Sequence, residues 1–378
     1  MTHVFAFSSP RAPWILAASV LGLLGCDHHT RYLDAAFDPY FLASDRDGLA
    51  EATDARLVNP VGLQVAPSGS LWVANNATGT ATLYGTDGTP LPAGAPLAVA
   101  LPVSPNAPSG SHAEATGIVY YGGSGLPIQT STKRDSARFL IATLDGTILG
   151  YNSDVDRENA ILALDNSATG AVYRGLAVTQ RRNGAWLYAT NFSAGTVDVF
   201  DENFAPATDL DPAAFEDQEL PADYAPFGIQ RIDGLLFVSY AERDSDGKSP
   251  VIGDGNGFID VFELDGRYVA RVASQGELNA PWGMTRSPWT FPYFGSALLV
   301  GNYGDGHINA FSLWDGSSLG VLRDSARDPV AIDGLWDLSF DYGFDGTPAL
   351  YFTAGPNGGA NGAFGTLISG LVDADPPR

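Results

Sequence analysis

The sequence predicts an all-β protein, a six-bladed β-propeller with four-stranded antiparallel blades. The first observation is a repeat: six glycines, each within a short apolar run, recur at intervals of 51 to 58 residues, at Gly62, Gly117, Gly175, Gly228, Gly283 and Gly334. The second is that short strands joined by Asn/Asp-Gly turns follow each glycine, as in antiparallel meanders. Repeats of about 50 residues with about four strands are typical of propeller blades.

The strands after each glycine align from unit to unit. The expected second strands are residues 71–75, 139–143, 187–191, 236–240, 298–302 and 350–354, and the third are 81–84, 147–151, 196–200, 258–262, 308–311 and 364–368. The matched order and spacing argue against six unrelated hairpins. Because one blade cannot bury both of its faces, the units must stack around an axis.

The repeat indicates one domain, residues 40–372, followed by a tail at 373–378. The blades are expected to start near residues 59, 114, 172, 225, 280 and 331. A short apolar run at residues 40–44 precedes the first unit. We expect it to be the outermost strand of blade six, because pairing the two termini in one blade closes the ring and removes an exposed sheet edge.

The first 25 residues predict a signal peptide of the lipoprotein type, and residues 26–39 a tether. Residues 14–24 form an apolar run of 11 residues, which is too short to span a membrane. Residues 23–26 (LLGC) resemble a bacterial lipobox, which implies lipidation of Cys26 and a membrane-anchored extracytoplasmic protein in the periplasm or at the cell surface. The alternative is ordinary cleavage and a secreted soluble protein. Cys26 is the only cysteine, so an intrachain disulfide is excluded.

The charge balance argues against nucleic acid as a partner. The formal net charge is −23, and only Lys133 and Lys248 are lysines, so a broad basic face is not expected. One local basic cluster, Lys133, Arg134 and Arg138, lies in an insertion of blade two. We interpret it as a solvated loop rather than a docking patch, and we expect a monomer.

The predicted ligand site is the rim of the central channel. In a propeller, the loops entering the innermost strands and those joining second to third strands lie on one face. The ring of residues before the six glycines is Val61, Thr116, Arg174, Phe227, Trp282 and Asp333. Mixed polar and aromatic groups around a concavity favour a ligand site. The predicted binding residues are Arg174, Trp282, Asp333, Phe227, Asn191, Asn302 and Glu114. The alternative is that Arg174 and Asp333 pair across a water-filled channel.

The repeats resemble NHL-type repeats and gluconolactonase-like six-bladed propellers. More closely, the chain resembles a bacterial family of exported propeller proteins, through residues 59–63 (NPVGL), 71–76 (LWVANN), 79–83 (GTATL), 253–262 (GDGNGFIDVF) and 301–306 (GNYGDG). The closer resemblance implies fold and export, and no reaction.

Calcium is the candidate cofactor. Gluconolactonase-like propellers hold a divalent ion on this axis with carboxylate and amide oxygens, so the resemblance implies Glu114, Asn191 and Asn302 as analogous ligands. A second candidate is an acidic loop in blade four with Asp244, Asp246, Asp254 and Asn256, whose oxygens suit calcium. That loop lacks the distal glutamate of an EF-hand, and Asp-Gly turns are common in this chain.

Two functions follow from these patterns. The first is an anchored or secreted binding module whose ligand, a small molecule, a glycan or a protein, sits at the channel mouth. The alternative is a calcium-assisted hydrolase of the lactonase kind. His112 and His307 lie outside any sequence context of a nucleophile, which favours the binding module.

Overall fold

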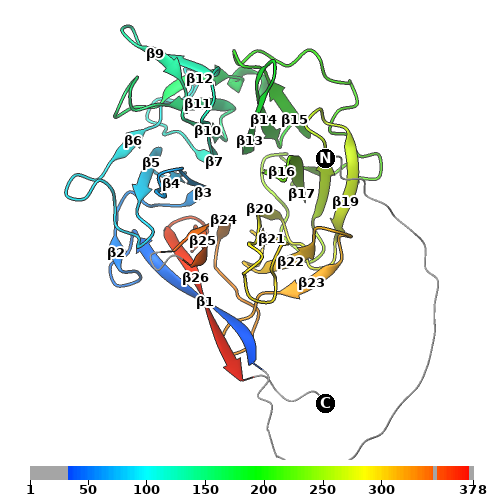
Figure 1. Cartoon of the computed structure of the whole chain (residues 1–378). Coiled ribbons are helices and arrows are strands. Elements are labelled where there is room, and N and C mark those ends of the chain that lie inside the picture. The colour runs from blue at the N-terminus through cyan, green and yellow to red at the C-terminus, as the bar shows by residue number, and fades with distance from the viewer. Residues whose placement is uncertain (1–32, 344–346, 374–378) are drawn as a thin grey trace, which may run out of the picture.

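Six antiparallel sheets surround a common axis in the computed structural model, which describes residues 33–343 and 347–373 (Figure 1). The predicted six-bladed β-propeller is confirmed. Each blade places its first strand next to the axis, and the following strands lie progressively further out.

The strands of the first three blades follow the predicted repeat. Blade one contains β3 (Pro60–Val65), β4 (Leu71–Asn75), β5 (Thr80–Tyr84) and β6 (Ala98–Ala100). Blade two contains β7 (Ala115–Tyr120), β10 (Phe139–Thr143), β11 (Thr147–Tyr151) and β12 (Ile161–Asp165), with an inserted hairpin of β8 (Pro127–Gln129) and β9 (Arg134–Ser136). Blade three follows the 3-10 helix η1 (Ser167–Thr169) and has three strands, β13 (Tyr173–Arg181), β14 (Gly184–Asn191) and β15 (Thr196–Phe200), one fewer than predicted.

The remaining blades complete the ring. Blade four contains β16 (Tyr224–Ile232), β17 (Leu235–Glu242), β18 (Phe258–Phe262) and β19 (Tyr268–Ser274). Blade five contains β20 (Pro281–Arg286), β21 (Ala297–Asn302), β22 (Ile308–Ser312) and β23 (Ser318–Val321). Blade six contains β24 (Leu335–Tyr342), β25 (Pro348–Ala354), β26 (Ala363–Asp373) and β1 (Leu33–Ser44), with the short β2 (Ala52–Thr53) beside β1.

The N-terminal strand closes the last blade, as predicted. β1 pairs antiparallel with β26, from Leu33 opposite Asp373 to Ser44 opposite Ala363. The strand is longer than expected, because it begins at Leu33 and takes up residues 33–39 that the sequence assigned to a tether. The predicted signal peptide and Cys26 lie outside the described residues.

Every innermost strand carries a β-bulge at the same place. In each blade, the pairing register between the first and second strands shifts next to the position of the repeated glycine. In blade one the shift lies between Pro60 and Gly62, and in blade four between Pro226 and Gly228. A bulge turns the extra residue out of the regular alternation. The six bulged positions therefore direct six side chains toward the axis at one level.

Hydroxyl groups on the second strands join neighbouring blades at this level. The Ser239 hydroxyl accepts the N–H of Gly228 at 2.9 Å and donates to the carbonyl of Pro281, in blade five, at 2.7 Å. Thr190 and Thr353 make the equivalent links in blades three and six. These bonds satisfy the N–H groups that the bulges remove from the strand ladder.

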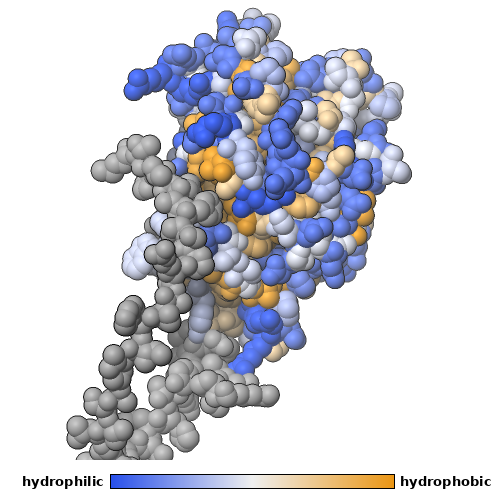
Figure 2. Space-filling view, turned by 90° about the vertical axis from the view of Figure 1, so that its right-hand side faces the viewer, coloured by the Kyte–Doolittle hydropathy of each residue, from blue (hydrophilic) through white to orange (hydrophobic). Residues whose placement is uncertain are grey.

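The cores lie mainly between adjacent blades, where the faces of neighbouring sheets pack together. Seen from the side, the surface is mostly hydrophilic, with small apolar groups between polar ones (Figure 2). Among the described residues there is no helix long and apolar enough to cross a membrane.

Candidate functional site

Six side chains occupy the bulged positions of the inner strands, and those from blades one, four, five and six pack together near the axis. We call this set the axial plug: Val61, Thr116, Arg174, Phe227, Trp282 and Trp336. All six are buried, and Phe227 is 0% exposed. Trp282 meets Trp336 edge to face, with ring centroids 5.8 Å apart. Of the predicted rim residues, Phe227 and Trp282 therefore belong to one buried apolar cluster, and Arg174 lies over the ring of Phe227.

The predicted ring position in blade six was wrong. Asp333 is exposed and accepts the backbone N–H of Asn357 at 2.9 Å. Gly334 has a positive φ of 68° and belongs to the loop before β24. Strand pairing aligns Leu335 and Trp336 of β24 with Pro281 and Trp282 of β20, so Asp337 stands where the other blades have the repeated glycine.

Arg174 is the one charged member of the plug. Its guanidinium lies over the rings of Phe192 and Phe227, 5.6 and 5.4 Å from their centroids. It donates a hydrogen bond to the backbone carbonyl of Lys248, and Nε has no hydrogen-bond partner among the described residues. Burial lowers the pKa of Arg174 to about 10. Arg174 therefore joins the acidic loop of blade four to the plug, and no ion pair with Asp333 forms.

The other predicted rim residues have separate positions. Asn191 and Asn302 hold turns: Asn191 binds Asp198 and the N–H of Val172, whereas Asn302 donates to the carbonyl of Glu277 and to Asp305. Glu114 is exposed on the loop before β7. The structure thus brings Arg174, Phe227 and Trp282 into direct proximity but gives the asparagines structural partners of their own.

The acidic loop does not gather its carboxylates around a point. Asp244 accepts backbone N–H groups from Lys248 and Ser249, and Asp246 accepts that of Lys248 as well. Within the described part of the chain, no group of three or more His, Cys, Asp or Glu side chains is arranged to hold a metal ion. Asp254 therefore does not complete a carboxylate group with Asp244 and Asp246, both of which accept N–H groups of their own turn, and Asn256 has Tyr224 and the carbonyl of Val251 as partners.

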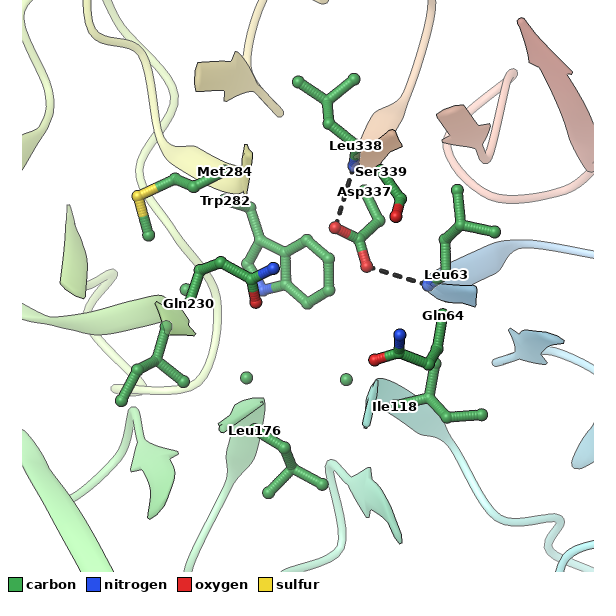
Figure 3. Close-up of a pocket in the computed structure, with 14 residues that line it drawn as sticks. Leu63, Gln64, Ile118, Leu176, Gln230, Trp282, Met284, Asp337, Leu338 and Ser339 are labelled. Atoms are coloured by element: carbon green, nitrogen blue, oxygen red, sulfur yellow. Dashed lines mark hydrogen bonds between the residues drawn. The ribbon is translucent and has the colours of Figure 1, made fainter. Parts of the chain in front are cut away.

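A narrow pocket lies on the axis, on the side of the plug toward which the inner strands run (Figure 3). Its volume is about 50 Å³. The indole of Trp282 lies across the middle of this view, with Asp337 beside it. The remaining lining residues come from all six inner strands: Leu63, Gln64, Gly117, Ile118, Gly175, Leu176, Gly228, Ile229, Gln230, Met284, Leu338 and Ser339.

Among the described residues that line this pocket, Asp337 alone is ionisable. Its carboxylate accepts the backbone N–H groups of Leu63 at 2.8 Å and Leu338 at 2.9 Å. No basic side chain among the described residues pairs with it. Burial raises the pKa of Asp337 to about 7, although the two N–H donors act in the opposite direction. The Nε1 atom of Trp282, also at this level, is buried without a hydrogen-bond partner among the described residues.

Sequence reasoning missed Asp337 because it followed glycine as the marker of each blade. The available signal was the preceding aromatic residue: Trp336-Asp337 in blade six matches Trp282-Gly283 in blade five. An Asp in place of the repeated Gly adds a carboxylate at a point where the backbones approach closely. That exception to the repeat, rather than the repeat itself, marks the candidate site.

Similar proteins support the fold and identify the chain's relatives. No family model matches the sequence. A solved structure, a structural genomics protein of unknown function from Bacteroides thetaiotaomicron, superposes with a TM-score of 0.51 at 12% identity, over 89% of this chain and 77% of that chain. At this identity the likeness shows the fold alone.

Two proteins of Acanthamoeba polyphaga mimivirus are similar in sequence. Uncharacterized protein R648 is 33% identical over 340 residues, which is 88% of this chain and 80% of the viral protein. Uncharacterized protein L690 is 32% identical over 340 residues, which is 88% of this chain and 86% of that protein. These relatives are viral, so they lend no support to the expected bacterial family. The chain belongs to the β-propeller family that includes these two mimivirus proteins.

Proposed function

We propose that the protein is a binding module and that the axial pocket at Asp337 takes a small cation of the ammonium type, either free or as the end of a larger ligand. The observation that carries the proposal is the carboxylate at the sixth glycine position. It faces a pocket whose other lining residues, as far as the structure describes the chain, carry no charge.

A bound cation would compensate the negative charge of Asp337. A partly buried carboxylate with only two backbone N–H partners retains unused lone pairs, and a cationic donor can occupy them. The pocket has space for roughly three to five waters, by the usual volume of about 10–15 Å³ for each. It therefore suits an ammonium group or a primary amine better than a sugar ring.

The positions of the two histidines in the described chain favour a binding function over a catalytic one. His307 lies 3.6 Å from Asp305 on a partly exposed turn, and His112 is exposed. Neither lines the axial pocket. The calcium-assisted hydrolase has less support, because the carboxylates of the acidic loop do not form a group among the described residues, and Asn191 and Asn302 are hydrogen-bonded to separate partners.

The test measures tryptophan emission and melting temperature, because Trp282 lines the pocket. Wild type, Asp337→Asn and Asp337→Gly would be titrated with ammonium or methylammonium chloride at constant ionic strength, with sodium chloride as the balancing salt. Asp333→Asn is the matched control, since Asp333 is exposed away from the pocket. We expect saturable changes in wild type and the control, and none in the two Asp337 variants. Equal responses in all four proteins would contradict the proposal.

We also propose that the chain is exported and anchored through Cys26, as a monomer on a cell-envelope membrane. The support is the sequence alone: the apolar run at 14–24 and the lipobox-like residues 23–26. Labelling cells with a palmitate analogue should modify wild type but not Cys26→Ser, and the variant should be released as a soluble protein. Membrane retention of an unlabelled Cys26→Ser protein would overturn the anchor.

A further inference from the structure

A second cavity, separate from the axial pocket, lies between blades one and two. We call it the blade-one/two groove. It is open and has a volume of about 510 Å³, within the usual range for small-molecule sites. Its lining residues are Ala66, Pro67, Ser68, Ser70, Trp72, Leu83, Leu97, Tyr120, Arg138, Phe139, Tyr151 and Ser153.

Aromatic rings form the base of the groove. Trp72 packs on Phe139 with ring centroids 4.4 Å apart and on Tyr151 at 5.3 Å, and Tyr120 meets Phe139 nearly edge to face at 5.3 Å. Trp72, Phe139 and Tyr151 are almost completely buried, so the apolar base is held by the core between the blades. A rigid aromatic base gives a flat apolar ligand a contact surface with little loss of side-chain entropy.

Arg138 supplies a cation at this groove without a carboxylate partner. It is half-buried immediately before β10, and its guanidinium has one long hydrogen bond, 3.5 Å from Nη1 to the carbonyl oxygen of Gly123. No ion pair of Arg138 occurs among the described residues, and no carboxylate lines the groove. In a chain with 43 Asp and Glu against 20 Lys and Arg, an arginine that has no ion pair and lies beside an aromatic base offers a local site for an anion.

The groove and the axial pocket are neighbours but separate. Gln64 lines the axial pocket and Tyr120 lines the groove, and the backbone N–H of Tyr120 donates to Gln64 Oε1 at 3.2 Å. This hydrogen bond joins one lining residue of each cavity, and the two cavities share no lining residue. A ligand of the groove therefore does not depend on Asp337.

We propose that the blade-one/two groove is a second binding site, which takes a small aromatic anion such as an aryl carboxylate or sulfonate. The aromatic body lies on the base formed by Trp72, Tyr120 and Phe139. The anionic group accepts hydrogen bonds from the guanidinium of Arg138, whose planar donors suit a carboxylate or sulfonate. Ser68 and Ser153 belong to the same lining and carry hydroxyl groups, which are potential further donors to it.

The experiment uses the fluorescent probe 8-anilinonaphthalene-1-sulfonate and the full-length protein. Dissociation constants would be measured for wild type, Arg138→Gln, Arg138→Lys and Tyr120→Leu. Arg134→Gln is the matched control, because Arg134 is exposed on the neighbouring hairpin and does not line the groove. Trp289→Ala tests the exposed aromatic side chain of blade five as a competing dye site.

We expect Arg138→Gln to weaken binding about tenfold, the size of one charge-assisted hydrogen bond. Arg138→Lys should lose less, and the two controls should lose nothing. Naphthalene-2-sulfonate should displace the dye, whereas 2-naphthylmethylamine should not. Equal dye affinity in wild type and Arg138→Gln, with both proteins melting alike, would overturn the proposal. Loss of dye binding in Trp289→Ala alone would assign the dye to blade five and would also overturn it.

Discussion

The carboxylate of Asp337 accepts the backbone N–H of Leu63 at 2.8 Å, and this bond joins the inner strand of blade six to the inner strand of blade one. At the other five junctions the matching position is glycine, and an added Cβ there would meet the next inner strand; at Gly283 it would lie 2.5 Å from the carbonyl oxygen of Trp336. The junction that closes the ring is thus the one that admits a side chain.

Closure of the ring and the proposed binding site therefore share one residue. β1 and β26 close the outer part of blade six through a long antiparallel pairing. Asp337 closes its inner part, with help from the Thr353 hydroxyl, which donates to the carbonyl of Val61 at 2.7 Å. A ligand that binds Asp337 would consequently stabilise the closed ring, by mass action.

The first prediction concerns pH. Because burial raises the pKa of Asp337 to about 7 in the folded protein, the folded state holds a proton that the unfolded state, with a pKa of about 3.9, releases. The free energy of unfolding should therefore fall as pH rises from 4 to 7, relative to Asp337→Asn, by on the order of 3 kcal/mol. Urea denaturation at several pH values measures this difference. If the free energy of unfolding of wild type and of Asp337→Asn changed in parallel with pH, the prediction would be contradicted. The control Asp333→Asn should show the same pH dependence as wild type.

The second prediction tests the plug. Trp282 is 5% exposed and packs against Trp336, so Trp282→Ala should lower the free energy of unfolding by about 3–5 kcal/mol. Trp289 is 82% exposed, and Trp289→Ala should change it by less than about 0.5 kcal/mol. Chemical denaturation of both variants gives the comparison. A Trp282→Ala protein as stable as wild type would mean that the packing of this side chain in the axial plug does not stabilise the fold.

The third prediction addresses the hydroxyl links between blades. Ser239→Ala leaves the N–H of Gly228 and the carbonyl of Pro281 without their buried partner, which should cost about 1–3 kcal/mol. Ser239→Thr is the matched control, because Thr190 and Thr353 occupy the same position in blades three and six. Hydrogen exchange at the Gly228 amide should accelerate in Ser239→Ala. An unchanged exchange rate at Gly228 and an unchanged free energy of unfolding would show that the Ser239 hydroxyl does not stabilise the contact between these blades.

The fourth prediction concerns close approach of the inner strands. A Cβ at Gly228 would overlap the carbonyl oxygen of Trp282 and approach the Ser239 hydroxyl. Gly228→Ala should therefore prevent folding or cost several kcal/mol, since backbone must move. A Cβ at Gly370 meets nothing within 4 Å, and Gly370→Ala should be nearly neutral. Soluble expression and melting temperature distinguish the two, and a Gly228→Ala protein that melts like wild type would be inconsistent with this packing.

The sequence by itself determined the repeat, the number of blades and the closure by the N-terminal strand. These features depend on local chemistry: alternating apolar residues define strands, and Asn/Asp-Gly pairs define the turns between them. It also identified Arg174, Phe227 and Trp282 as neighbours on the axis, because equivalent positions in a repeat meet at the same level. Their burial could not be read from the spacing, since it depends on how far six side chains of different size fill one small space.

Only the tertiary structure decided which residue of blade six faces the axis. Within the sequence, Gly334 continues the glycine spacing as well as any alternative, yet strand pairing shifts the register by three residues and places Trp336 and Asp337 at the axis. Register in a sheet is fixed by contacts with the neighbouring strands, which are remote in sequence. The pKa of Asp337 follows from the same contacts, because the inner strands around the pocket partly bury its carboxylate.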